Sequence, residues 1–321
     1  MTIVKKEILI LGKTPPPIGG VTIHTDRLVN WLETDNLDFR FIKLSYINLI
    51  SIPFYLNNYS CVHVHSSNPL VRLYIMAMCK LYRKFGIVTI HGDLYRFKSK
   101  IKNWLDRKTI QIADRPITLN DRSLSIALKI NPNSEMISSF IPPIYTNEKL
   151  DLTHIEHIKQ MKKKYTLLFC TNASNLSYDK NENEIYGITE LIEFFSTHTQ
   201  FGLIFSDPSS AYRNSFRECN FDIPENVYVI SGDHSFYKVM EISDASIRNT
   251  TTDGDSISVK ESLYLNKITF ATNVVSRPKG CILYNKGQLK EILAYLQKEH
   301  TGHTVKVENG YIRLKEIYLN T

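Results

Sequence analysis

Short apolar runs rich in β-branched residues alternate along this chain with longer stretches in which apolar residues recur every three or four positions. The short runs predict strands, and the longer stretches predict amphipathic helices. Such alternation is typical of parallel βαβ units, so we predict an α/β fold built on doubly wound sheets. The strands predicted in the first half are Glu7–Leu11, Phe39–Leu44, Cys61–His65, Ile87–Ile90, Arg115–Leu119 and Glu135–Ser138. The helices predicted there are Val21–Glu33, Pro69–Phe85, Ile101–Ala113 and Asp121–Lys129.

A proline pair within Ile141–Ile144 interrupts this pattern, because consecutive prolines continue neither a helix nor a central strand. The alternation then restarts. The strands predicted in the second half are Thr166–Cys170, Phe201–Phe205, Val227–Ile230, Ser246–Arg248, Ile268–Ala271 and Gly280–Leu283. The helices predicted there are Ile155–Lys164, Ile185–Ser196, Ser209–Cys219, Phe236–Ser243, Ser258–Leu265 and Gln288–Lys298. We therefore predict two Rossmann-like domains, residues 1–147 and 148–321, which also suits the length of the chain.

The composition is that of a folded globular protein, with 43% hydrophobic and 22% charged residues. The five cysteines are scattered and never spaced as C-x-x-C, which argues against a disulfide framework and against a zinc knuckle. The apolar runs are too short for a secretory signal or a membrane-spanning helix. We therefore expect a cytoplasmic protein, either soluble or peripheral on the inner face of the plasma membrane.

The positive charge is concentrated in the first domain. That domain has 19 Lys and Arg against 10 Asp and Glu, a net charge of +9, whereas the second domain has 20 against 22, a net charge of −2. The span Arg72–Lys108 holds ten basic residues and two acids. Within it, Lys80, Arg83 and Lys84 are predicted to share one helical face. Such a patch attracts the phosphates of lipids, nucleic acids or pyrophosphate-linked substrates, or it is simply a solvated surface.

The loop after the first strand is rich in proline and ends in Gly19 and Gly20. It matches neither the P-loop nor the dinucleotide-binding glycine motif. Two residues without Cβ atoms still allow a ligand to approach the backbone N–H groups and the positive end of the following helix. The alternative is a proline-stiffened turn whose glycines serve its geometry alone.

Three histidines stand on or beside predicted strands. His63 and His65 share one face of a strand, but the sequence shows no third ligand at suitable spacing, so we predict no metal site. His91 directly follows a strand, at the carboxyl end where ligands bind in open α/β sheets. The alternative for each histidine is a buried imidazole satisfied by a backbone carbonyl.

The segment Arg248–Leu263 joins a strand to a helix in the second domain and is rich in small polar residues, so we expect it to bind an anion. Within it, Asp253-x7-Glu261 resembles the E-x7-E motif of the retaining GT-B glycosyltransferases of the GT4-type superfamily. The pair Gly19-Gly20 resembles the glycine-rich first loop of that family, and the segment 89–92, which contains His91, resembles its histidine-bearing strand end. The resemblance covers both halves of the chain in the family's order.

This resemblance implies a GT-B fold, in which two Rossmann-like domains face a central cleft. It implies a hexosyl- or N-acetylhexosaminyltransferase that works with retention and without a metal or other cofactor. The donor would be a nucleotide-diphosphate sugar, with a UDP-sugar favoured, and the acceptor a lipid-linked or surface glycan, as in lipopolysaccharide or capsule biosynthesis. The basic first domain would hold the acceptor beside an anionic membrane, through Lys80, Arg83 and Lys84.

The resemblance also assigns roles to residues. Glu261 would bind the ribose hydroxyls, and His91 and Asp253 would be catalytic and face the donor sugar. The full donor-binding set is Gly19, Gly20, Asn172, Lys180, Arg248, Gly254, Asp255, Ser256, Ile257, Ser258 and Glu261. The family's arginine and lysine that neutralise the diphosphate are missing after the first strand of the second domain. Lys180 or Arg248 would replace them.

Four alternatives remain open at this point. Ser258-x-x-Glu261 is also a capping box, and Asp253-Gly254-Asp255 matches the metal-binding D-x-D of GT-A glycosyltransferases. The protein could be a non-catalytic nucleotide-sugar binder, or it could bind nucleic acid through Arg72–Lys108, a partner that we do not expect. The sequence leaves open the donor nucleotide and sugar, the acceptor and linkage, and the oligomeric state.

Overall fold

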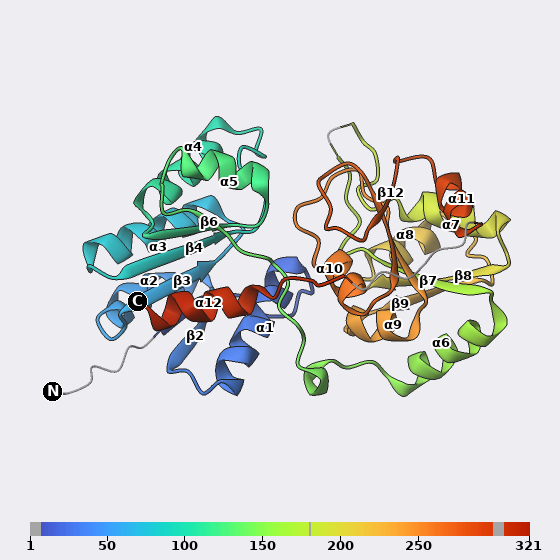
Figure 1. Cartoon of the computed structure of the whole chain (residues 1–321), viewed down its shortest axis with the longest axis horizontal. Coiled ribbons are helices and arrows are strands. Elements are labelled where there is room, and N and C mark those ends of the chain that lie inside the picture. Colours follow the sequence, from blue (N-terminus) through green and yellow to red (C-terminus); the bar gives the residue numbers. More distant parts are fainter. Residues whose placement is uncertain (1–7, 180, 298–304) are drawn as a thin grey trace. The chain divides into compact units, whose positions relative to one another are not determined.

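The computed structural model describes residues 8–179, 181–297 and 305–321. The chain divides into two compact units, Met1–Ile144 with Glu308–Thr321, and Tyr145–Val307. Each unit is built on a six-stranded sheet whose neighbouring strands pair in parallel, with helices packed on it (Figure 1). The predicted α/β class with two Rossmann-like halves is confirmed.

The first unit has the strand order β2-β1-β3-β4-β5-β6. The order in which strands are added therefore reverses between β1 and β3, while every strand stays parallel. The period-two pattern of the strands separates two cores: Leu9 and Leu11 face one, and Ile8 and Ile10 face the other. The strands are β1 (Ile8–Gly12), β2 (Phe39–Lys43), β3 (Cys61–His65), β4 (Phe85–Ile90), β5 (Arg115–Thr118) and β6 (Glu135–Met136). The helices are α1 (Gly20–Thr34), α2 (Tyr46–Leu56), α3 (Pro69–Leu81), α4 (Lys100–Ile112) and α5 (Asp121–Leu128).

The predicted helix Pro69–Phe85 is too long, because α3 ends at Leu81. Arg83 has a left-handed backbone with φ of 54°. Its N–H donates to the carbonyl of Lys80, and the N–H of Lys84 donates to that of Cys79, which is the Schellman arrangement that closes a helix. The prediction that Lys80, Arg83 and Lys84 share one helical face is therefore wrong.

The second unit has the strand order β12-β11-β10-β7-β8-β9, so its change of direction lies between β7 and β10. Its sheet also separates two cores, with Phe169 on one face and Leu168 on the other. The strands are β7 (Leu167–Asn172), β8 (Phe201–Asp207), β9 (Val227–Ser231), β10 (Ala245–Arg248), β11 (Ile268–Thr272) and β12 (Ile282–Tyr284). A 3-10 turn, η1 (Tyr145–Asn147), precedes the helices α6 (Leu152–Lys164), α7 (Ile188–Thr197), α8 (Ala211–Glu218), α9 (Phe236–Ile242), α10 (Ile257–Tyr264) and α11 (Lys290–Leu296).

The last helix, α12 (Gly310–Leu319), belongs to the first unit, although the sequence analysis placed residues 148–321 in one domain. Figure 1 shows α12, in red, among the blue and cyan elements of the first unit. Tyr311, Leu314 and Ile317 are buried in the same core as Ile8 and Ile10. The chain returns because an amphipathic helix covers apolar surface that this face of the sheet would otherwise expose.

A matched pair of substitutions in α12 tests this packing. Ile317 is 5% exposed and Ile312 is 59% exposed, so removing one methylene group affects the core only at Ile317. We expect Ile317→Val to lower the free energy of unfolding by about 0.5–1.5 kcal/mol, and Ile312→Val to leave it nearly unchanged. Urea denaturation followed by circular dichroism measures both. Equal effects of the two substitutions would contradict the docking of α12.

Candidate functional site

A cluster of two arginines and one aspartate lies at the carboxyl end of β10. Arg248, the last residue of that strand, donates from Nε and Nη2 to the two carboxylate oxygens of Asp253, at 2.9 and 3.1 Å. Arg277, in the segment after β11, donates from Nη1 to the same carboxylate at 2.7 Å. The three side chains are only 13%, 9% and 2% exposed, in the order Arg248, Asp253, Arg277. One carboxylate thus balances two guanidinium groups, and the cluster keeps an excess positive charge.

The aspartate is ionised in this setting. Burial raises the pKa of Asp253, but the two neighbouring arginines outweigh it and hold the pKa below its ordinary value. Burial likewise lowers the pKa of Arg248, and the carboxylate of Asp253 more than offsets it. The positive excess of the cluster is therefore present throughout the neutral pH range.

Neighbouring groups fix both arginines. Nη1 of Arg248 lies 3.4 Å from both the backbone and the side-chain oxygen of Asn172, the last residue of β7, and Cζ lies 5.0 Å from the ring centre of Tyr186. Arg277 donates from Nε to the carbonyl of Thr272 at 3.1 Å. Asn172 and Arg248 stand at the ends of β7 and β10, the position at which open α/β sheets bind ligands.

The helix that follows this loop begins at Ile257, with Ser256 as its N-cap. Ser258 is therefore the second residue of the helix, and the capping-box interpretation of Ser258 and Glu261 is wrong. Among the described residues, the Ser256 side chain accepts no capping hydrogen bond from the first-turn amides. The first-turn amides of α10 are thus a site at which an anion is stabilised. Glu261 lies on the second turn and is 5% exposed.

The D-x-D interpretation is weakened by the partners of its two carboxylates. Asp255 forms an ion pair with Lys260, whereas Asp253 is held by the two arginines. Gly254, between them, donates its N–H to Oδ1 of Asp253 at 3.1 Å. The two acids therefore bind different cations of the protein.

The predicted glycine loop of the first unit ends at α1. Gly19 is the N-cap in an extended conformation, and its N–H donates to Oγ1 of Thr22 at 3.0 Å. A Cβ atom at Gly19 would come no closer than 4.0 Å to another atom, so packing does not require glycine there. Gly12 differs, because a Cβ atom on it would lie 2.8 Å from Thr25. Gly20 begins the helix.

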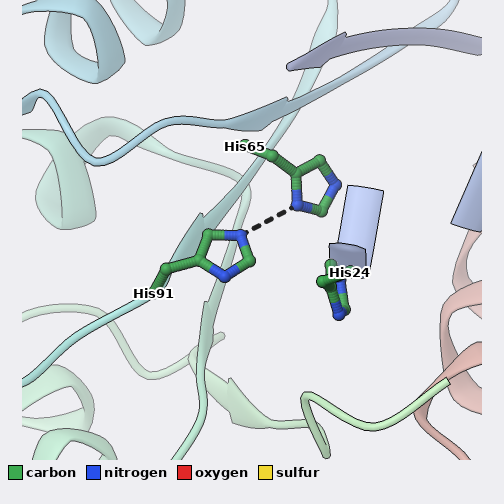
Figure 2. A group of neighbouring side chains, drawn as sticks. All are labelled: His24, His65 and His91. Atoms are coloured by element: carbon green, nitrogen blue, oxygen red, sulfur yellow. Dashed lines mark hydrogen bonds between the residues drawn. The ribbon is translucent and has the colours of Figure 1, made fainter. Parts of the chain in front are cut away.

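The histidines of the first unit separate into two roles. Nδ1 of His63 lies 2.5 Å from the hydroxyl of Tyr318, and Nε2 lies 2.8 Å from that of Thr89, so this ring is satisfied inside the core. His65 and His91 are joined by a hydrogen bond of 3.1 Å between Nδ1 and Nε2. His24, which the sequence analysis did not select, completes a group of three with them (Figure 2).

The predicted basic patch is smaller than expected. Lys80 forms an ion pair with Asp114, and Nζ of Lys84 donates to the carbonyl of Asn57 at 3.2 Å. Arg83 is exposed. Lys180 lies outside the described residues. No helix in the part of the chain that the structure describes is long and apolar enough to cross a membrane.

The sequence matches no protein-family model and no curated protein. Solved structures do match, over 98% of this chain. HepE of Anabaena, crystallised in complex with UDP-glucose, has a TM-score of 0.70 at 11% sequence identity, with 98% of its chain covered. A sucrose-phosphate synthase of Thermosynechococcus elongatus has 0.67 at 10%, with 95% covered. WaaG, described as a glycosyltransferase involved in lipopolysaccharide biosynthesis, has 0.62 at 13%, with 100% covered.

The chain has the GT-B fold. The match extends over both units and nearly the full length of each of these proteins, so it includes the two sheets and the returning α12. Within the GT-B fold, the structure brings together Asn172, Arg248 and Asp253 from the predicted site. It adds Arg277, which lies in an irregular segment and belongs to no motif, so sequence reasoning could not select it.

Proposed function

We propose that this GT-B protein is a glycosyltransferase that moves a sugar, with retention, from a nucleotide-diphosphate sugar to a lipid-linked or surface-glycan acceptor. The observation that carries the proposal is the buried arginine cluster of Arg248 and Arg277 at the ends of β7 and β10, together with the uncapped first turn of α10. A diphosphate is the ligand class that buried arginines and first-turn amides bind best. UDP is the favoured nucleotide because HepE, of the same fold, was crystallised with UDP-glucose.

In this mechanism the second unit holds the donor. The first-turn amides near Ser256 to Ser258 and the guanidinium of Arg248 stabilise the negative charge that develops on the leaving diphosphate. Asp253 positions Arg248 and Arg277, and in the proposed assignment it also borders the donor sugar. Glu261 accepts hydrogen bonds from the ribose. No metal takes part, because the fixed cations of the protein perform that neutralisation.

Turnover assays with a panel of nucleotide sugars test the proposal. Purified protein should release nucleoside diphosphate from one donor, faster with a lipid-linked glycan acceptor, and nuclear magnetic resonance of the product should show the anomeric configuration of the donor. Donor binding without transfer or hydrolysis would favour the non-catalytic nucleotide-sugar binder instead. Salt-sensitive binding of nucleic acid, with no response to nucleotide sugars, would favour the remaining alternative.

We further propose that the first unit contacts an anionic membrane surface through Arg83 and its basic neighbours. Arg83 is exposed, whereas Lys80 is paired with Asp114, so the two residues should contribute unequally. We expect Arg83→Gln to weaken binding to phosphatidylserine-containing vesicles by about fivefold, since one basic residue near such a surface contributes about 1 kcal/mol. Lys80→Gln should have a smaller effect. Vesicle co-sedimentation measures both, and unchanged binding in Arg83→Gln would leave the patch as solvated surface.

A further inference from the structure

Three imidazole rings of the first unit surround one point. His24 comes from α1, His65 ends β3, and His91 directly follows β4 (Figure 2). Their ring centres form a nearly equilateral triangle, with sides of 5.2 Å from His24 to each of the others and 5.3 Å between His65 and His91. One nitrogen of each ring lies within 4.8 Å of the other two.

The ring of His24 is oriented by the backbone. Its Nδ1 lies 2.8 Å from the carbonyl oxygen of Ser139, and a carbonyl can only accept a hydrogen bond. Nδ1 therefore carries the proton, and Nε2 carries the lone pair. An imidazole that donates one N–H to a carbonyl and presents its other nitrogen is the arrangement that orients metal-ligating histidines.

His65 and His91 are close to the spacing of two ligands on one ion. A tetrahedral zinc with metal–nitrogen distances of about 2.0–2.1 Å holds its ligand nitrogens about 3.4 Å apart. Nδ1 of His65 and Nε2 of His91 are 3.1 Å apart. Binding needs only a tautomer change, in which the proton between them moves to the outer nitrogen of its own ring. In that tautomer the proton of His65 lies on Nε2, which is buried without a hydrogen-bond partner among the described residues. The ligand nitrogen of His24 lies within 4.8 Å of the other two, so a side-chain rotation would have to bring it closer.

We propose that His24, His65 and His91 bind one divalent transition-metal ion of the zinc class, with a fourth position left for water or an oxygen ligand. Three nitrogens with no carboxylate suit zinc, copper or nickel, whereas magnesium, calcium and manganese prefer oxygen. The sequence pairs His63 with His65 and therefore shows no third ligand. In the structure, the partners of His65 are instead His24 from α1 and His91 from the end of β4.

The metal would regulate the protein rather than serve its chemistry. This consequence rests on the proposed function, which needs no metal, and on the catalytic role that the family resemblance implies for His91. An ion on Nε2 of His91 removes that lone pair from catalysis. Micromolar zinc should then inhibit sugar transfer, and a chelator should restore it, whereas chelator alone should leave the metal-free enzyme active.

Metal binding tests the site without reference to activity. Zinc is titrated calorimetrically into the chelator-treated full-length protein, and the visible spectrum is recorded with cobalt, whose tetrahedral complexes absorb far more strongly than its octahedral ones. We expect one ion per chain and a tetrahedral cobalt spectrum. His24→Gln and His91→Gln should each weaken binding on the order of a hundredfold or more, since each removes a ligand.

His157→Gln is the control, because His154 and His157 are three residues apart on α6 and flank the ring of Tyr228, where a surface histidine pair could hold zinc adventitiously. Binding that His157→Gln abolishes, or that survives both cluster substitutions, would overturn the proposal. If those variants unfold, X-ray absorption of the zinc-loaded wild type decides. Three imidazole ligands support the site, and two or fewer contradict it. Failure of sugar transfer alone would affect only the proposed function.

Discussion

Replacing Glu261 by Gln is expected to weaken donor binding by about ten- to a hundredfold. The substitution keeps the size of this 5% exposed side chain but removes its charge. A hydrogen bond that a carboxylate accepts from a ribose hydroxyl contributes about 1.5–3 kcal/mol, and an amide oxygen supports only part of it. Calorimetric titration with the best nucleotide sugar, and with the free nucleoside diphosphate, measures the change.

Both ligands should lose affinity to a similar extent, because both carry the ribose. Glu193→Gln on α7 is the matched control, since that side chain is exposed, and it should leave both affinities unchanged. Because α10 begins at Ile257, Ser258 is not its N-cap, and Glu261 cannot form a capping box with it. Wild-type affinity of Glu261→Gln for both ligands would refute the ribose role.

The elements that the sequence predicted best are those whose pattern comes from two-sided burial. Cys61–His65 was predicted with its observed bounds, because every residue of the strand is buried and turn residues flank it. Helix α2, Tyr46–Leu56, was missed. It contains Pro53 and is apolar on nearly every side, so it has neither helical periodicity nor a clear start and end. Helix α12, Gly310–Leu319, was also missed, and its docking on the first unit could not be predicted, since nothing local in a helix says which sheet it covers.

The site divides in the same way. His65 and His91 could have been placed together from the sequence, because β3 and β4 pair in parallel and His91 lies just beyond the register partner of His65. His24 could not, since it joins them only through the packing of α1 on the sheet. Arg277 could not be predicted for a similar reason. Its segment shows no hydrophobic periodicity or motif, and the Arg277 side chain meets Asp253 only because β10 and β11 are neighbours in the sheet.

Replacing Asp253 by Asn should have the largest effect on stability. The change leaves the guanidinium groups of Arg248 and Arg277 buried side by side without their counter-ion. Breaking a buried ion pair by removing one partner costs about 3–5 kcal/mol. We expect a loss of that order in the free energy of unfolding, measured by urea denaturation. Asp222→Asn, an exposed aspartate in the same unit, should change it little.

The pH dependence of this effect has a definite sign. The folded-state pKa of Asp253 is lowered, so its contribution is fully present above the unfolded pKa of about 3.9 and is lost as the pH falls through the folded value. The difference in stability between wild type and Asp253→Asn should therefore be constant from neutral pH down to about 5 and shrink in stronger acid. A difference that grows in acid would show that another group causes it.

The same variant separates a structural cluster from a donor site. If the arginines bind the diphosphate, UDP can supply the negative charge that the substitution removes, so UDP should raise the melting temperature of Asp253→Asn more than that of wild type. Ligand binding stabilises the native state in proportion to the logarithm of ligand concentration over the dissociation constant. Uridine, which lacks the phosphates, is the control and should not differ between the two proteins. An equal response of wild type and variant to UDP would show that the two arginines only hold the loop.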